Sequence, residues 1–443
     1  MKLKKRDFIA FGIMAILLAV AIAVDVLAGM WGDVITMHLY GSGQNLTEDN
    51  KELTAALSKS RLLNYDIAEE GVVLVKNEDE TLPLSKDEIK KINIFGWSSS
   101  DGGWVCGSDG SAASNDGVAK NKLKMNGILQ MCDKKYCKKC GWGNEKSASK
   151  CTKNDCGGKE FVDYGIEYNQ ELAAMYKNFC ASRALDGNGN LIRALTGDPR
   201  YYLLTEPVRE KYDEAGENGK TILQNAKEFS DIALVVISRL GGEGVDLPFV
   251  QYKNLDGTKP KVTDHDKNAP EDPSRTYLDI TTEEEALLKM VTENFNKVIV
   301  LYNSCNEMNL SFLDDYDVDA ALISNGLGEN GIFALPALLT GDANPSGKTT
   351  NTHAYDLTYD STFVNAAGQT LSKGSYVIYQ ENIYSGYKWY ETADKEGYWA
   401  NYTKEISDRK GGKKTLTGYD AVVQYPFGYG LSYTDFKWEI VEF

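Results

Sequence analysis

Apolar runs alternate with helix-like patterns through the middle of the chain. Three runs of mostly branched or small apolar residues are Ile232–Ile237, Lys297–Asn303 and Ala320–Ser324. Such uninterrupted runs are typical of strands buried on both faces of a parallel sheet. An amphipathic helix is predicted over 282–295, opened by a capping box at 282–285. This rhythm of strand and helix predicts an α/β fold with a largely parallel sheet covered by helices on both faces.

The same reading extends toward the amino end. A helix is predicted over 52–68 and a strand over 92–96, and two more helices over 171–179 and 220–229. Residues 31–50 are polar and form a predicted stalk ahead of one large domain over 51–436.

A different pattern opens the chain. Basic side chains within residues 2–6 precede an apolar stretch over 8–29 that only Asp25 interrupts. A span of about 20 apolar residues crosses a bilayer as a helix, and the basic flank predicts a cytoplasmic amino terminus. Residues 1–30 are therefore predicted to anchor the protein in the cell membrane by a single pass, with the main domain extracellular. Cleavage near 21–23 would instead make this stretch a signal peptide and the protein secreted.

The strand Ile232–Ile237 leads into a glycine-rich loop that carries one glutamate, Glu243, between Gly242 and Gly244. Glycine tolerates backbone conformations that lift a side chain off a sheet. In open α/β sheets, ligands bind beyond the carboxyl ends of the strands. Glu243 is thus a candidate catalytic carboxyl, with a solvated loop glutamate as the alternative. Arg239, Gly242, Gly244 and Asp246 are candidates for contacts to the substrate.

Composition limits the partners. The chain has 443 residues, with 64 acidic against 48 basic side chains and a net charge of −16. That charge repels phosphate backbones, so no nucleic-acid partner is expected.

Cysteine is concentrated in residues 130–160, which hold five of the eight cysteines. The spacing of Cys137, Cys140, Cys151 and Cys156 is compatible with four thiolate ligands around a structural zinc. Disulfides are an equal alternative, because an extracellular compartment is oxidising. Either linkage would be a structural staple, and no other cofactor is indicated.

Several segments resemble family 3 glycoside hydrolases, the β-glucosidase and β-xylosidase group, in the order in which that family has them. They are the 238–246 loop, the 326–331 turn, the Asn-Pro-Ser-Gly turn within 338–347, the strand-like 383–390 segment and the Pro-Phe-Gly-Tyr-Gly segment of 425–436. The resemblance covers roughly 60–436, and residues 130–160 are an insertion in it. It implies the α/β sandwich of the family's C-terminal-type domain, and the role of general acid/base for Glu243.

The resemblance also implies a nucleophile that these residues do not provide. The family's nucleophile is an aspartate followed by an aromatic residue on a separate barrel domain, and none of the four Ser-Asp pairs here has an aromatic residue after it. A barrel needs about 250 residues. The chain is therefore expected to be a hydrolase half that acts on oligosaccharides or aryl β-glycosides together with a separate barrel domain or chain. In this reading 437–443 begin a truncated β-domain. The alternative is a surface module that binds glycans without cleaving them.

Overall fold

The computed structural model describes residues 14, 16–21, 51–100, 127–181, 206–239, 275–304, 306–328, 330–363, 379–408, 412–437 and 439–442. Its contacts divide the chain into residues 1–60 and 61–443. In the first unit, residues 14 and 16–21 are helical, and helix α2 (Lys51–Gly71) begins. Among the residues so described, no helix is long and apolar enough to cross a membrane. Most of the predicted anchor, 8–29, lies outside them.

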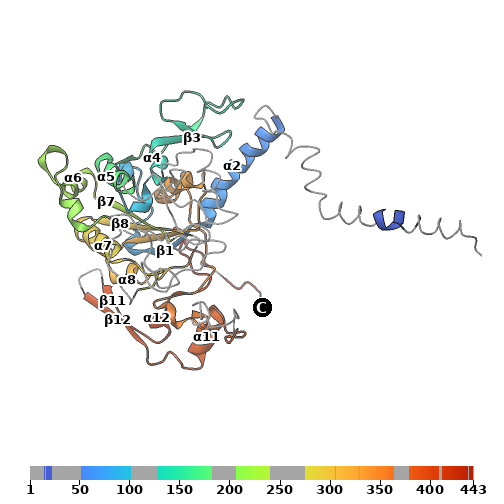
Figure 1. Cartoon of the computed structure of the whole chain (residues 1–443). Coiled ribbons are helices and arrows are strands. Elements are labelled where there is room, and N and C mark those ends of the chain that lie inside the picture. Colours follow the sequence, from blue (N-terminus) through green and yellow to red (C-terminus); the bar gives the residue numbers. More distant parts are fainter. Residues whose placement is uncertain are drawn as a thin grey trace, which may run out of the picture. The chain divides into compact units, whose positions relative to one another are not determined.

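A mainly parallel six-stranded sheet forms the centre of the second unit (Figure 1). Its strands in spatial order are β1 (Val73–Asn77), β9 (Ala320–Ser324), β8 (Lys297–Asn303), β7 (Ile232–Ile237), β2 (Lys91–Phe95) and β6 (Glu167–Tyr168). Only β1 runs antiparallel to its neighbour; β9, β8, β7, β2 and β6 pair in parallel. The α/β fold with a parallel sheet is confirmed. The three runs predicted as strands coincide with β7, β8 and β9.

Both faces of the sheet are buried because side chains alternate along each strand. In β7, Val235 belongs to one apolar core and Leu234 to the other. The first core is completed by the helices α5 (Gln170–Ala181), α6 (Ile222–Phe229), α7 (Thr282–Asn294) and α8 (Phe312–Asp315). The second is completed by α2, α4 (Gln130–Asp133) and α9 (Leu335–Thr340). This two-sided burial explains why β7, β8 and β9 are apolar without interruption.

The capping box of α7 lies one residue earlier than predicted. Thr281 is the N-cap, and its hydroxyl accepts a hydrogen bond from the Glu284 backbone N–H. The Glu284 carboxylate in turn accepts one from the Thr281 N–H at 2.9 Å. The shift matters because it places Glu284, rather than Glu285, against the interior.

Smaller sheets are formed by other segments of the chain. Strands β3 (Lys134–Cys137), β4 (Gly143–Glu145) and β5 (Phe161–Val162) form a three-stranded sheet in the cysteine-rich segment. Toward the carboxyl end, β10 (His353–Ala354) pairs with β13 (Val423–Tyr425), and β11 (Thr403–Asp408) with β12 (Gly412–Thr417). Helix α12 (Tyr419–Val422) lies between β12 and β13 in the chain.

The strand-like interpretation of 383–390 is wrong. Helix α11 (Tyr387–Lys395) occupies much of that segment. Tyr390 and Ala393, three residues apart and therefore on one helix face, are both buried in an aromatic cluster with Trp399. That burial favours the helix over an extended strand. Near the carboxyl terminus, the described residues 439–442 form no strand.

Two of the family-like segments lie against each other. Asn344 accepts a hydrogen bond from the Tyr433 N–H at 2.8 Å, and the Tyr433 hydroxyl donates to the Leu338 carbonyl at 2.8 Å. A Cβ on Gly430 would lie 2.3 Å from the Gly347 carbonyl oxygen, so no side chain fits between the two loops. The specific sequence of both segments thus serves the scaffold.

Candidate functional site

Polar residues follow the parallel strands at their carboxyl ends. Ser98 comes after β2, Ser238 and Arg239 after β7, and Ser304 after β8, and all four are buried. The turn after β2 packs directly on β7: a Cβ on Gly96, whose φ is +97°, would meet the Val236 carbonyl oxygen at 2.2 Å. This edge of the sheet is the one where ligands bind in open α/β folds.

Arg239 is buried, and protein groups accept from its donors. Its Nη1 and Nη2 donate to the two carboxylate oxygens of Glu284 at 2.9 and 2.6 Å. The remaining bonds go from Nε to the Tyr277 carbonyl, from Nη1 to the Ser238 carbonyl and from Nη2 to the Asp279 carbonyl. These five bonds match the five N–H groups of a guanidinium.

The charge of Arg239 is compensated inside the fold. Burial lowers its pKa, but the Glu284 carboxylate outweighs burial and raises the pKa above its ordinary value. With its donors engaged in this conformation, Arg239 positions the start of the loop. The substrate contact predicted for it would require these bonds to break.

The backbone of Arg239 is held as well. Its carbonyl oxygen accepts hydrogen bonds from the Ser304 hydroxyl and from the Asn306 amide, the latter at 3.2 Å. Both donors lie in the segment after β8. Gly242, Glu243, Gly244 and Asp246 lie outside the described residues.

A second carboxyl group lies after β8 and was not predicted from the sequence. Glu307 Oε1 is 3.8 Å from Nδ1 of His353, which opens β10. Burial, helped by Asp360, raises the pKa of Glu307 to about 7. Burial lowers the pKa of His353 to about 4. No sequence motif indicates Glu307. Its environment forms only when segments that are distant in the sequence pack together.

A cavity of about 400 Å³ adjoins the Arg239 anchor. Asp279, Glu285, Tyr316 and Tyr355 are among the residues that line it. The Tyr316 hydroxyl donates to Glu285 at 2.5 Å, and the Arg275 guanidinium donates to the same carboxylate. These hydrogen bonds outweigh the effect of burial and lower the pKa of Glu285. Aromatic rings beside carboxyl groups could accommodate a polyhydroxylated ligand.

Another cavity, of about 670 Å³, lies elsewhere. Lys91 and Glu167, which begin β2 and β6, belong to its lining. It is therefore at the amino ends of these parallel strands, opposite to the edge where ligands bind in such sheets.

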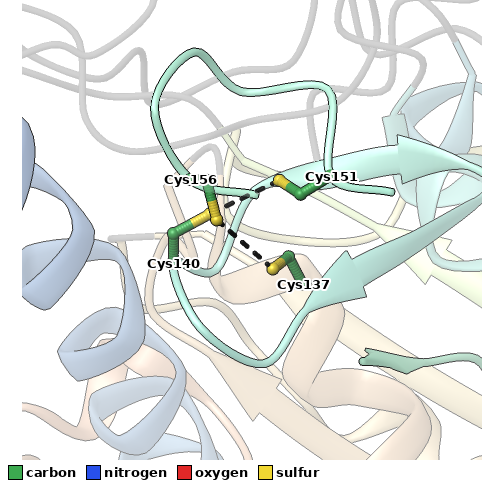
Figure 2. Close-up of side chains that lie close together, drawn as sticks. All are labelled: Cys137, Cys140, Cys151 and Cys156. Atoms are coloured by element: carbon green, nitrogen blue, oxygen red, sulfur yellow. Dashed lines mark hydrogen bonds between the residues drawn. The ribbon is translucent and has the colours of Figure 1, made fainter. Parts of the chain in front are cut away.

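Figure 2 shows the four predicted cysteine ligands converging on one point. Their sulfur atoms all lie within 4.8 Å of one another, and all four residues are buried. Cys137 ends β3, Cys140 lies in the turn after it, and Cys151 and Cys156 come from the loop between β4 and β5. Cys132 is also buried but lies in the core of the main sheet, where burial raises its pKa to about 12.

Comparison with known proteins finds β-glucosidases among the relatives of this chain. β-Glucosidase A of Butyrivibrio fibrisolvens is 31% identical over 224 residues, which cover 49% of this chain and 23% of that protein. A β-glucosidase of Ruminococcus albus is 26% identical over 277 residues, covering 62% and 22%. The chain thus spans less than a quarter of the length of either relative.

A solved structure is similar over most of the chain. β-Glucosidase 3B of Thermotoga neapolitana, in complex with α-D-glucose, is 22% identical with a TM-score of 0.49, and the match covers 86% of this chain and 39% of that one. Residues 72–433 match the glycosyl hydrolase family 3 C-terminal domain. With more than half of its length matched, the chain belongs to the family of glycosyl hydrolase family 3 C-terminal domains.

Proposed function

We propose that this chain supplies the acid/base half of a β-glucosidase-like active site, with Glu243 as the proton donor. The nucleophile would come from a barrel domain, and the substrates would be oligosaccharides or aryl β-glycosides. The observation that carries the proposal is the anchoring of Arg239 at the carboxyl end of β7. The Arg239 side chain donates hydrogen bonds to the Glu284 carboxylate, and the Arg239 carbonyl accepts hydrogen bonds from the segment after β8.

Anchoring restricts where the following residues can reach. Glu243 is four residues beyond Arg239, and four residues span at most about 14 Å. Because Arg239 is fixed and only a few residues separate it from Glu243, the Glu243 carboxyl group is expected to occupy a defined position rather than to move freely in solvent. Glycines on either side of Glu243 would tolerate the backbone conformations needed to direct its side chain toward a sugar.

The chemistry assigned to Glu243 has two steps. A nucleophilic carboxylate attacks the anomeric carbon while the glycosidic C–O bond breaks, and Glu243 gives its proton to the departing oxygen. The resulting Glu243 carboxylate then takes a proton from water, whose oxygen displaces the enzyme carboxylate from the sugar. The first step requires a raised pKa for Glu243, which a nearby nucleophile carboxylate would provide.

The proposal includes an extracytoplasmic location. Support comes from the basic residues within 2–6 and the apolar stretch over 8–29. Such a sequence would hold the domain at the outer face of the cell membrane, or direct its secretion if cleaved.

The test is Glu243→Gln in the full chain combined with a barrel domain of the family. We expect kcat/KM for glycosides with poor leaving groups to fall by about 10²- to 10⁴-fold, because proton donation is lost. Azide should partly restore turnover of activated aryl glycosides by attacking the glycosyl-enzyme without needing a base. The 443-residue chain alone should not hydrolyse them.

Asp246→Asn is the matched control, since it also neutralises a carboxylate in the same loop without changing its size; the loss of a substrate contact at Asp246 would not be rescued by azide. Normal turnover by Glu243→Gln, or a large azide-rescued loss in Asp246→Asn alone, would exclude the assignment of Glu243.

A second candidate function is glycan binding without cleavage, in the cavity lined by Tyr316 and Tyr355. It predicts oligosaccharide binding by the chain alone, measurable by calorimetry. Glu243→Gln should leave that binding unchanged, whereas Tyr316→Ala should weaken it. If the barrel-reconstituted protein hydrolyses glycosides through Glu243, a purely binding role is excluded.

A further inference from the structure

The distances between the clustered cysteine sulfurs fit a tetrahedral metal ion better than two disulfides. Cys137 Sγ lies 3.7 Å from Cys156 Sγ, and Cys140 Sγ lies 3.6 Å from Cys151 Sγ. Four sulfurs around a tetrahedral zinc, with Zn–S bonds of about 2.3 Å, are separated by about 3.8 Å. Two disulfides would instead draw the sulfurs into two bonded pairs at about 2.0 Å. The two observed separations match the tetrahedral value, and all four sulfurs lie within 4.8 Å of one another.

Each pair of cysteines lies on a turn that is closed by a similar backbone hydrogen bond. In the first turn the Cys137 N–H donates to the Trp142 carbonyl at 2.9 Å, two residues beyond Cys140. In the second the Cys151 N–H donates to the Gly158 carbonyl at 2.7 Å, again two residues beyond the second cysteine, Cys156. The two turns differ in length, but each contributes one pair of cysteines to the cluster.

A glycine with positive φ makes each turn. Gly141 follows Cys140 with φ +67°, and Gly157 follows Cys156 with φ +63°. This left-handed conformation is one that glycine adopts without strain. It lets the next backbone N–H, of Trp142 or Gly158, donate to the sulfur of the preceding cysteine. Backbone N–H groups directed at sulfur stabilise negative charge on a thiolate.

Cationic side chains surround the turns. Lys139 Nζ donates to the Cys156 carbonyl at 2.7 Å, and Arg61 Nε donates to the Cys140 carbonyl at 2.9 Å. Lys153 lies over the Trp142 ring, 5.0 Å from its centroid. Four thiolates with one divalent ion carry a net charge of −2, which these cations offset.

The first turn also contacts residues 61–71 of helix α2, which belong to the same unit as the sheet. Beyond the Arg61 bond, the Tyr65 hydroxyl donates to the Gly141 carbonyl, and the Tyr65 ring lies 4.7 Å from that of Tyr136. A Cβ on Gly141 would lie 3.0 Å from the Arg61 Cβ, so the first turn and α2 are in close contact.

We propose that Cys137, Cys140, Cys151 and Cys156 bind one zinc ion as thiolates, and that this zinc-bound pair of turns fastens residues 61–71 of α2 to the sheet domain. The site is independent of the glycosidase chemistry. All four ligand positions come from the protein, which leaves no open position for substrate and gives the ion a structural role.

The first test is the metal content of the full chain, purified in detergent. Elemental analysis should find about one zinc per chain. Cys140→Ser and Cys151→Ser should each lose it, while Cys132→Ala, which removes a buried thiol outside the cluster, should retain it. Refolding with cobalt(II) should produce the visible absorption of a tetrahedral tetrathiolate ion in the wild type and in Cys132→Ala only.

A milder variant tests the geometry without removing a ligand. A Cβ on Gly158 would lie 2.6 Å from Cys137 Sγ, whereas one on Gly71 would meet nothing within 4 Å. Gly158→Ala should therefore weaken zinc affinity by about 10- to 100-fold, and Gly71→Ala should not change it. Zinc removal should accelerate amide hydrogen exchange in residues 61–71.

Three outcomes would overturn the proposal. Mass spectrometry of the unreduced, alkylated protein could find these cysteines joined in disulfides. The purified and zinc-exposed protein could hold no zinc while all four thiols react freely. Finally, zinc could remain at the same substoichiometric level in Cys140→Ser, which would identify an adventitious ion only.

Discussion

The ion pair between Arg239 and Glu284 allows a quantitative prediction. The two side chains are 0% and 1% exposed, so solvent does not screen the interaction. Glu284→Gln keeps the size of the side chain and its ability to complete the capping box with Thr281, because glutamine is also accepted at that position. The variant therefore removes mainly the charge that compensates Arg239.

Leaving a buried guanidinium without its counter-ion costs about 3–5 kcal/mol. We expect the free energy of unfolding, measured by urea titration at neutral pH, to fall by that amount. Glu405→Gln provides the contrast. It breaks the ion pair between Glu405 and Lys413, whose side chains are 62% and 72% exposed, respectively. The free energy of unfolding should not change resolvably.

A double variant separates charge from packing. Arg239→Met combined with Glu284→Leu removes both charges and fills the space with apolar groups of similar size. The double variant should cost less than the sum of the two single variants, because each single variant leaves one buried charge unpaired and the double variant leaves none. If Glu284→Gln is no more destabilising than Glu405→Gln, the pair is not the buried anchor described above, and the support it lends to the position of Glu243 is lost.

Other predictions concern titration and close packing. The raised pKa of Glu307, about 7, means that the folded state binds its proton more tightly than the unfolded state, whose value is about 4.3. Glu307 therefore lowers stability as pH rises from about 4.3 to 7, by up to about 3 kcal/mol. The lowered pKa of His353, about 4, acts in the opposite direction and raises stability as pH rises from about 4 to 6.5. In urea titrations between pH 4 and 7, the free energy of unfolding of Glu307→Gln should rise with pH relative to the wild type, and that of His353→Gln should fall. If neither variant changes the pH dependence of the free energy of unfolding, these two environments are contradicted. Gly430→Ala would place a Cβ 2.3 Å from the Gly347 carbonyl and should cost at least about 1–3 kcal/mol in the same assay, while Gly71→Ala should cost nothing measurable.

The layered fold could be predicted from local sequence because both faces of the sheet are buried. Strands β7, β8 and β9 must be apolar at nearly every position, and that requirement leaves a direct mark in the sequence. Helix α7 was likewise predictable from its periodicity and cap, although the N-cap hydroxyl is that of Thr281. The 383–390 segment was not, because the burial of Tyr390 and Ala393 around Trp399 depends on residues outside it.

For the sites, sequence determined which residue types were available, and tertiary structure decided what each one contacts. Spacing singled out the four cysteines, but only folding brings their sulfurs within 4.8 Å of one another, because each pair lies on its own turn. The sequence predicted a substrate contact for Arg239, whereas in the structure its guanidinium donates hydrogen bonds to Tyr277, Asp279 and Glu284. Glu307 carried no signal at all, since the pKa of a carboxyl group depends on desolvation by neighbours that are distant in the chain. Local sequence encodes periodic burial; hydrogen-bond partners and electrostatic environments arise only when separate segments meet.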